Sequence, residues 1–303
     1  MLRRSFIQLL ASGVLYALLS VRGQAAPPKR YSFDHGVASG DPLADGVIVW
    51  TRVSGADGET LTVTWQVARD AAMQSLVASG TAETDGARDY TVKVDARDLP
   101  SGTRLFYRFM IGDQASPVGR TKTLPAGSVD ETKLAVVSCS NHPYGYFYAY
   151  REIAKRDDLD AVVHLGDYIY EYGMGEYGTE RAAALGRIPD PPTELLTLSD
   201  YRRRYAQYRS DPDLQALHTN HPAIVVWDDH EIANDGWRDG AENHGNRDDV
   251  DEGLWQARRE AAIQAWFEWL PVRGEPRRGK TQIFREFRWG DLVKLVMLDT
   301  RFY

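Results

Sequence analysis

The chain has 303 residues, 43% of them hydrophobic and 26% charged, with a formal net charge of −7. These values are typical of a soluble globular protein with enough residues for two domains, and the acidic balance argues against general binding to nucleic acid or to anionic membranes. A single cysteine, Cys139, excludes an internal disulfide.

The first 26 residues have the pattern of an export signal. Arg3 and Arg4 precede an apolar stretch that is short for a membrane span, and the small residues Ala25 and Ala26 follow it. This order of basic, apolar and small residues predicts a signal peptide over 1–26. The paired arginines favour the twin-arginine export machinery, with the general secretory route as the alternative. We expect a periplasmic or secreted protein that keeps no stable membrane anchor after cleavage.

Residues 31–124 contain short runs of alternating apolar residues separated by turn sequences. Four such runs are GVIVWTRV, TLTVTWQVA, DYTVKVDA and RLFYRFMIG. Their regular spacing predicts an all-β sandwich of the immunoglobulin or fibronectin type. Within the segment GVASGDP, Asp41 is expected to cap a turn rather than to act in a site. Residues 125–133 (PAGSVDETK) are small or polar and are predicted to be a linker.

From residue 134 onwards the pattern changes to strands that alternate with helices. The strands are nearly continuous apolar runs, which predicts a sheet covered on both faces by helices. We therefore expect an α/β domain over 134–303. The expected strands are Leu134–Val137, Ala161–Leu165, Ala223–Trp227 and Leu292–Leu298, and the expected helices are Gly145–Arg156, Ser199–His218 and Glu252–Leu270.

Each of the four expected strands is followed by polar residues that can bind metals or anions. In open α/β sheets, ligands bind outside the carboxyl ends of the strands, so these side chains are expected to meet at one edge. Clustered carboxylates repel one another unless a cation lies between them, which predicts a metal site. The candidates are Cys139 after the first strand, Asp167 and Tyr170 after the second, Asp228, Asp229, His230 and Asn234 after the third, and Asp299 and Arg301 after the fourth.

The segment GDYIYEYG carries the most informative of these residues. Asp167, held at the end of its strand, can bridge two cations, and Tyr170 can return to the same place as a phenolate. A phenolate together with the thiolate of Cys139 favours trivalent iron over zinc or calcium alone. Packing at the edge of the sheet is the alternative interpretation of Tyr168, Tyr170 and Tyr172.

Several segments resemble the PhoD-type alkaline phosphatases. GVASGDPLADGVIVWTR resembles the amino-terminal domain of that family, and SCSNHPYGYFYAYREIA, DAVVHLGDYIYEYG, WDDHEIANDGW and FREFRWGDLVKLVMLDTR resemble successive motifs of its metallophosphatase domain. The resemblance implies a phosphomonoesterase or phosphodiesterase with a centre of Fe³⁺ and Ca²⁺, with other divalent metals as the alternative. Members of the family usually continue well beyond the LDTR motif, so we expect the metallophosphatase domain over 134–303 to be incomplete.

The resemblance also implies roles for residues in the first three motifs. By their positions, Cys139 and Tyr170 look like iron ligands, and Asp167 looks like the ligand that bridges the two metals. Asn234 matches an amide that binds calcium or the phosphate group. The substrate would be a phosphate ester.

The remaining candidates have less definite roles. Asp228, Asp229 and His230 hold the place where related metallophosphatases carry an Asn-His motif, and which of the three binds metal is open. Asp299 is a further candidate ligand. Arg301 could bind phosphate or form a salt bridge with a nearby acid.

We expect metal-assisted hydrolysis, in which cations polarise the phosphoryl oxygens and activate a water molecule. His230 or His142 could protonate the leaving group, whereas His164, on a strand, is expected to be structural. A serine or cysteine hydrolase that uses Cys139 or a neighbouring serine is one alternative, although no Gly-x-Ser-x-Gly sequence accompanies them. An exported binding module with a degenerate α/β part is the other.

Overall fold

The computed structural model describes residues 31–245, 251–276 and 281–303. The export signal predicted over 1–26 lies outside these residues. Within the described ranges, no helix has both the length and the apolar character needed to cross a membrane. Tyr31–Tyr303 is held together as one unit by its internal contacts.

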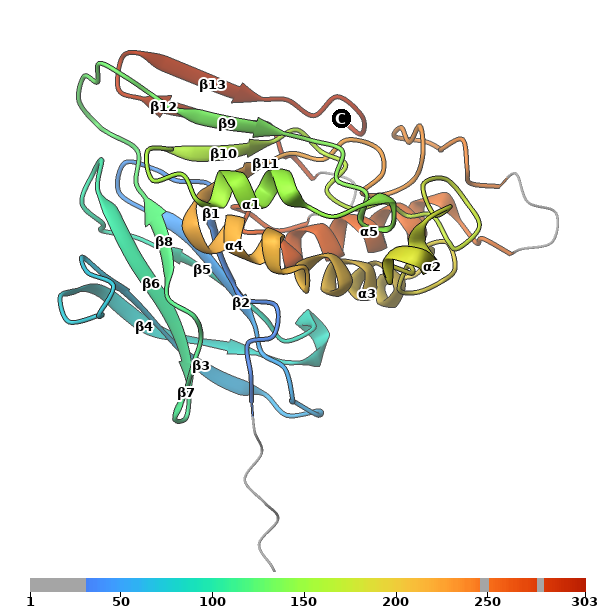
Figure 1. The fold of residues 1–303 in the computed structure, drawn as a ribbon, viewed down its shortest axis with the longest axis horizontal. Coiled ribbons are helices and arrows are strands. Elements are labelled where there is room, and N and C mark those ends of the chain that lie inside the picture. The colour runs from blue at the N-terminus through green and yellow to red at the C-terminus, as the bar shows by residue number, and fades with distance from the viewer. Residues whose placement is uncertain (1–30, 246–250, 277–280) are drawn as a thin grey trace, which may run out of the picture. The chain divides into compact units, whose positions relative to one another are not determined.

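Two sheets in the N-terminal part of this unit enclose a core of aliphatic and aromatic side chains (Figure 1). The core follows from the alternation of apolar residues along the strands. In β6, Arg104–Ile111, every second residue is buried and faces this core. One sheet has the order β4-β3-β6-β7, with β8 paired to β6, and the other contains β5, β2 and β1. The remaining bounds are β1 Val37–Gly40, β2 Val47–Arg52, β3 Leu61–Ala68, β4 Leu76–Thr84, η1 Gly86–Arg88, β5 Thr91–Ala96, β7 Gln114–Ala115 and β8 Gly119–Lys122.

The second of these sheets continues into the C-terminal part of the chain. Its full order is β5-β2-β1-β11-β10-β9, and β1 pairs in parallel with β11, with Gly40 opposite Ala223. Gly40 is required at this junction, since a Cβ there would lie 2.4 Å from the carbonyl oxygen of Pro271 and 2.5 Å from that of Ala223. The linker predicted over 125–133 thus joins two sequence regions that share one sheet.

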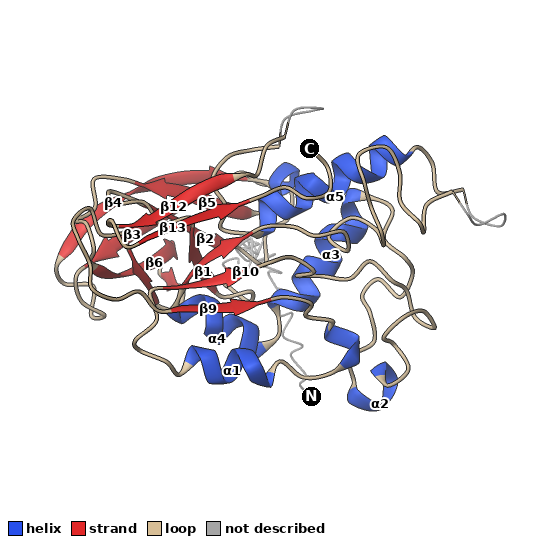
Figure 2. Ribbon diagram, turned by 90° about the horizontal axis from the view of Figure 1, so that it is seen from above, coloured by secondary structure: helices blue, strands red, loops and turns tan. Residues whose placement is uncertain are grey.

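Strands β9, β10 and β11 pair in parallel within the shared sheet, as three of the four apolar runs predicted. The fourth run, predicted over Leu292–Leu298, forms β13 and pairs with β12 in a separate antiparallel hairpin instead of joining the sheet. Helices α1, α3, α4 and α5 lie on one side of it, and the hairpin β12–β13 lies on the other (Figures 1 and 2). This differs from the predicted sheet with helices on both faces. The bounds are β9 Leu134–Val137, η2 His142–Tyr144, α1 Tyr148–Ala154, β10 Ala161–His164, α2 Ala182–Leu185, α3 Leu198–Arg209, α4 Pro212–Asn220, β11 Pro222–Val225, α5 Trp255–Trp269, β12 Arg285–Trp289 and β13 Val293–Met297.

The helix predicted over Ser199–His218 is two helices. α3 begins at a capping box formed by Thr197 and Asp200 and ends at Arg209, and α4 begins at Pro212. Proline is well placed at the first position of a helix, and the side chain of Asp211 accepts hydrogen bonds from the first turn of α4. Pro212 therefore divides the segment into two helices, although its apolar pattern alone predicts one continuous helix.

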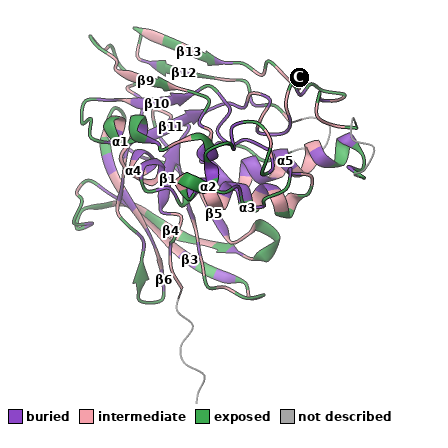
Figure 3. Ribbon diagram, turned by 45° about the vertical axis from the view of Figure 1, so that its right-hand side comes forward, coloured by how far each residue is buried: buried purple, intermediate pink, exposed green. Residues whose placement is uncertain are grey.

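The main core contains many of the buried aromatic residues of the chain. β10 and β11 are buried along their whole length, whereas β9 is half-buried with Val136 exposed, and β13 alternates between half-buried and exposed positions before its buried end (Figure 3). Tyr201 and Tyr205 of α3 pack with Trp266 and Trp269 of α5 in the same cluster, and all four are fully buried. The hairpin contributes Phe287, Trp289 and Met297 to that cluster.

Asp41 does more than cap a turn. It is buried at the end of β1, its two carboxylate oxygens accept hydrogen bonds from the guanidinium of Arg285 at 2.8 Å each, and Oδ2 also accepts the backbone N–H of Arg273 at 2.7 Å. The pair joins the N-terminal strands to β12, which lies more than 200 residues later in the chain. Asp41 therefore belongs to the framework and not to a site.

Two buried histidines should make the protein sensitive to acid. His164 on β10 and His218 on α4 share hydrogen bonds with the hydroxyls of Tyr150 and Tyr168, at 2.9 and 2.8 Å. Burial lowers the pKa of His164 to about 3, and burial also lowers the pKa of His218 well below its ordinary value. Below about pH 6.5 the unfolded chain therefore binds more protons than the folded chain, and each histidine should reduce the free energy of unfolding by up to ~1.4 kcal/mol per pH unit.

Urea unfolding between about pH 7 and pH 5 measures this effect. As the pH is lowered, the free energy of unfolding should decrease more steeply in the wild type than in His218→Gln, because glutamine cannot take up a proton. Equal slopes in the two proteins would show that His218 is not the group that titrates.

Candidate metal centre

The carboxyl ends of β10 and β11 carry the candidate centre. Asp167 follows β10, Asp229 and His230 follow β11, and one ligand atom of each lies within 4.8 Å of the others. Gly166 allows the two loops to meet, because a Cβ on it would lie 2.2 Å from the backbone nitrogen of Asp228. Parallel pairing and this close approach place three side chains of metal-binding type in one group.

Asp167 fits the role of a metal ligand. Its side chain is buried, Oδ2 accepts a hydrogen bond from the Tyr170 hydroxyl at 3.2 Å, and Oδ1 is buried with no hydrogen-bond partner among the described residues. Burial raises the pKa of Asp167, the charge of His230 opposes the rise, and the charge of Asp229 adds to it. A cation against Oδ1 would favour the ionised form and reverse the shift, so the donor set fits a metal.

Cys139 and Tyr170 lie beside Asp167. The thiol of Cys139 is near enough to both for them to influence its pKa, which burial raises. Cys139 and Asp167 both have positive φ, +57° and +53°, a conformation that is uncommon for residues with a side chain and that is concentrated at functional sites. The loops after β9 and β10 are joined by a hydrogen bond from the Cys139 N–H to the Gly166 carbonyl at 3.2 Å.

His230 is oriented by a buried carboxylate. Its Nδ1 lies 2.9 Å from Oε2 of Glu171, and its ring stacks on that of Tyr170 with 4.3 Å between centroids. Burial acts to lower the pKa of His230, but the hydrogen bond and charge of Glu171 outweigh it and raise the pKa to about 9. With Nδ1 bound to Glu171, Nε2 is the ring atom that is left to bind a metal or move a proton.

Glu231 holds the two loops in register. It is fully buried, and its carboxylate accepts the backbone N–H groups of Asp167 at 3.1 Å, Tyr168 at 2.7 Å and Asp228 at 2.9 Å. Burial raises the pKa of Glu231 to about 8. Neither Glu171 nor Glu231 was among the predicted site residues, although both lie inside motifs that supply predicted ligands.

Arg301 meets the centre from the C-terminal segment. Its Nε donates to Asp228 at 2.5 Å and its Nη2 donates to Asp229 at 3.2 Å. The structure thus contains the salt bridge that was one of the two predicted uses of Arg301. The same contacts place a guanidinium next to Asp229, beside the group of three ligands, where a phosphate oxygen could also reach it.

The structure does not bring Asn234 or Asp299 into the group of three. The side-chain amide of Asn234 donates to the carboxylate of Glu242. Asp299 uses Oδ1 to accept the Trp227 indole N–H at 3.0 Å, together with two backbone N–H groups, while its buried Oδ2 has no hydrogen-bond partner within the described ranges. Asp228 is turned toward Arg301. The predicted roles of these residues as ligands stay predictions.

The other two histidines considered for chemistry belong to the core. His164 is buried against Tyr150, as expected for a structural residue. His142 is buried between Phe147 and Tyr208, and burial lowers its pKa to about 3. Neutral imidazole is a much weaker acid than imidazolium, so His142 is a poor candidate for the acid that protonates a leaving group.

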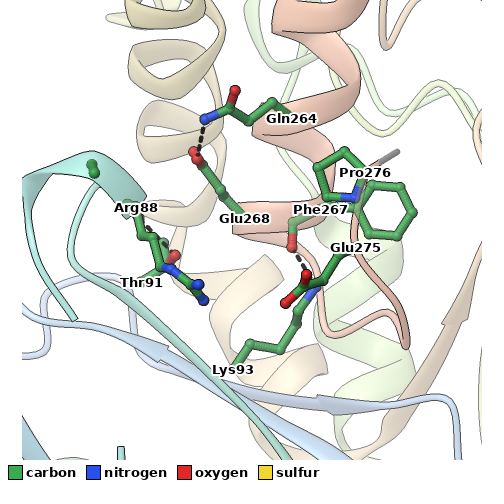
Figure 4. A pocket seen from close by; sticks show the side chains of 9 residues that line it. Arg88, Thr91, Lys93, Gln264, Phe267, Glu268, Glu275 and Pro276 are labelled. Atoms are coloured by element: carbon green, nitrogen blue, oxygen red, sulfur yellow. Dashed lines mark hydrogen bonds between the residues drawn. The ribbon is translucent and has the colours of Figure 1, made fainter. Parts of the chain in front are cut away.

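Two cavities bear on the position of the site. One, of about 250 Å³, adjoins Cys139 and is also lined by Ser140, Tyr146 and Phe147. The other, of about 220 Å³, lies between β5 and α5 (Figure 4), and Lys93 in it donates to the carbonyl oxygens of Phe267 and Gly274 at 2.8 and 3.1 Å. None of the predicted site residues lines this second cavity.

Comparisons with known proteins agree with the resemblance seen in the sequence. The family model described as "PhoD-like phosphatase" matches residues 134–303, and the one described as "PhoD-like phosphatase, N-terminal domain" matches residues 19–125. The chain is 40% identical to alkaline phosphatase D of Bacillus subtilis (strain 168), over 90% of this chain and 47% of that protein. A solved structure described as "Structure of PhoD" superposes with a TM-score of 0.84 at 39% identity, covering 92% of this chain and 54% of the other. The chain thus spans about half the length of these relatives.

Proposed function

Because this chain belongs to the PhoD-like phosphatase family, we propose that it hydrolyses phosphate esters, monoesters or diesters, at the group formed by Asp167, Asp229 and His230. The observation that carries the proposal is the buried Asp167 Oδ1, which has no hydrogen-bond partner in the part of the chain that the structure describes and lies inside a group of carboxylate and imidazole side chains. Its relative in Bacillus subtilis is called an alkaline phosphatase, which supports this class of reaction.

Asp167, Asp229, Cys139 and Tyr170 are the residues that would hold metal. The thiol and phenol suit Fe³⁺, and the carboxylates suit Ca²⁺. Bound cations would supply positive charge that polarises the phosphoryl oxygens and makes water a better nucleophile. Asn234 and Asp299 remain proposed as further ligands, with Asn234 released from Glu242 on binding.

Arg301 and His230 would do the remaining work, with Glu171 positioning His230. Arg301 would bind a phosphoryl oxygen while its other nitrogens stay fixed by Asp228 and Asp229. His230 would hold a proton at Nε2 for the leaving oxygen, since Glu171 keeps Nδ1 engaged and stabilises the protonated ring.

Metal removal tests this proposal. The full chain, freed of metal by chelation and reloaded with Fe³⁺, Ca²⁺ or both, should hydrolyse p-nitrophenyl phosphate or bis-p-nitrophenyl phosphate only when reloaded. We expect restored rates at least ~10³-fold above the metal-free protein, because charge stabilisation by a metal contributes several kcal/mol to the transition state. Elemental analysis of the same samples gives the metals and their ratio.

Two results would contradict the proposal. Folded, metal-loaded protein without any hydrolysis would favour the exported binding module. Hydrolysis that survives chelation but is lost on alkylation of Cys139 would favour a thiol hydrolase. The hydroxyl of Ser140 donates to the backbone carbonyls of Asp167 and Tyr168, which counts against Ser140 as the nucleophile of a serine hydrolase.

The remaining proposals concern the cell and the fold. We propose export through the twin-arginine machinery to the periplasm or the medium, supported by Arg3 and Arg4 and by the apolar stretch that follows them. An immunoglobulin- or fibronectin-like class for the N-terminal strands is supported by the two facing antiparallel sheets, β4-β3-β6-β7 and β5-β2-β1.

A further inference from the structure

Four aromatic rings form a continuous series from the candidate centre to the solvent. The ring of His230 stacks on Tyr170 and lies 5.5 Å from that of Tyr172. Tyr177 in turn lies 5.6 Å from Tyr172 and 6.4 Å from Tyr170. Tyr170 is buried and Tyr172 half-buried, while Tyr177 is 62% exposed. The series therefore has one end at the proposed ligands and the other in water.

The loop that carries Tyr177 is held by hydrogen bonds on both sides of it. The backbone N–H of Gly175 donates to the hydroxyl of Thr179 at 3.0 Å, and the N–H of Met174 donates to the carbonyl of Pro192 at 2.7 Å. The next residue, Gly178, has a φ of +75°, and a Cβ on it would lie 2.4 Å from the side chain of Asn141. Tyr177 is thus presented by a fixed turn that packs against the loop after β9.

An isolated exposed tyrosine needs no explanation, but Tyr177 is backed by two other rings and faces water with much of its surface. Covering that surface with another ring would remove apolar area from water and add a stacking interaction. We infer that Tyr172 and Tyr177 form a subsite beside the candidate centre that stacks on the ring of an uncharged, ring-bearing alcohol, the ester partner of the phosphate. This inference rests on the proposed function, since it places the phosphate at Asp167, Asp229 and His230.

Negative charges near Tyr172 restrict the kind of ligand that the subsite can bind. Glu171, Glu242 and Asp229 all lie near enough to Tyr172 for their charges to act on its hydroxyl. A second anionic group in this place would be repelled, as like charges are in a partly buried site. The subsite therefore suits an aryl or nucleoside group that carries a single phosphate, and it disfavours a chain of several phosphates.

Binding of two phosphonates tests the subsite without any turnover. Phenylphosphonate carries a ring and methylphosphonate does not, and neither has an ester bond to hydrolyse. In calorimetric titrations of the metal-loaded full chain, Tyr177→Ala should weaken phenylphosphonate about fivefold and methylphosphonate less than about twofold, as expected for the loss of one stacking contact. Tyr177→Phe, which keeps the ring, should bind both ligands as the wild type does.

Tyr148→Ala is the matched control. Tyr148 is also an exposed tyrosine, 54% accessible and stacked on Tyr146, but it lies on α1. Its loss should leave both affinities unchanged. Equal weakening of both phosphonates by Tyr177→Ala, an equal effect of Tyr148→Ala, or no binding of phenylphosphonate to the wild type would each overturn the subsite.

Turnover assays separate this inference from the proposed function. A Tyr177-dependent preference for phenylphosphonate in a protein that hydrolyses no ester would support the subsite and refute the phosphatase. Hydrolysis of p-nitrophenyl phosphate and glycerol 2-phosphate with the same change in KM on Tyr177→Ala would support the phosphatase and refute the subsite.

Discussion

Replacing Asp167 by asparagine is expected to abolish phosphoesterase activity while leaving the fold intact. Asparagine has the same shape and tolerates the φ of +53° found at this position. It removes the charge that would hold a cation at the buried Oδ1, so kcat/KM should fall at least ~10³-fold and metal content should drop. Rates with p-nitrophenyl phosphate and elemental analysis measure the two effects.

The stability of the metal-free variant makes this test sharp. Burial raises the folded-state pKa of Asp167, so keeping that group ionised at neutral pH destabilises the metal-free fold, and Asp167→Asn removes the effect. The metal-free variant should therefore unfold at the same urea concentration as the wild type or at a higher one.

A carboxylate at the other end of the same strand serves as control. Asp160 lies directly before β10. Its carboxylate accepts a hydrogen bond from the backbone N–H of Lys133 at 2.8 Å and forms an ion pair with Lys122. Asp160→Asn should lower stability and leave metal content and kcat unchanged. Loss of activity in Asp167→Asn without loss of metal, or equal losses in the two variants, would contradict the assignment of Asp167 as a ligand.

Asp41→Asn is expected to lower the free energy of unfolding by about 3 kcal/mol, because it leaves the guanidinium of Arg285 without its charged partner in a largely buried place. The side chain of Asp41 is 2% exposed and that of Arg285 17%. The pair joins β1 to β12, so its loss should weaken the packing of the hairpin on the sheet. Urea or thermal unfolding measures the change.

An exposed ion pair from the same region provides the comparison. Asp45 pairs with Arg97 at 2.9 Å, but the two side chains are 65% and 43% exposed. Asp45→Asn should cost less than about 1 kcal/mol, as is usual for ion pairs in water. Arg285→Leu combined with Asp41→Asn should recover part of the loss, because the unpaired charge is then gone. A cost of Asp41→Asn as small as that of Asp45→Asn would show that burial adds nothing to this pair.

The strands that end at the site could be predicted closely. Leu134–Val137 was predicted to the residue, and the runs beginning at Ala161 and Ala223 match β10 and β11 within two residues at either end. A strand buried on both faces, as β10 and β11 are, needs continuous apolar residues, and this pattern can be recognised from neighbouring residues alone. Pro212 is also recognisable in the sequence as a residue that a continuous helix does not accommodate. The apolar pattern on both sides of it nevertheless predicts one helix, where the structure has α3 and α4.

The contacts made by the residues next to the predicted ligands could not be predicted from the sequence. The sequence shows Glu171 and Glu231 next to predicted site residues, but it does not show that both turn inward to accept hydrogen bonds from His230 and from three backbone N–H groups. The direction of a side chain in a loop depends on backbone torsions set by distant contacts. The same holds for Asn234, whose amide is turned to Glu242.

The sequence by itself determined the family, the strand order in the chain and the residue types available for chemistry, because motifs and apolar periodicity are properties of neighbouring residues. Only the tertiary structure decided that β1, β2 and β5 extend the sheet of the site, that Arg301 is shared between Asp228 and Asp229, and that Tyr177 stands at the end of a series of rings. Each of these depends on contacts between residues far apart in the chain, whose pairing is fixed by the packing of the whole core and not by local sequence.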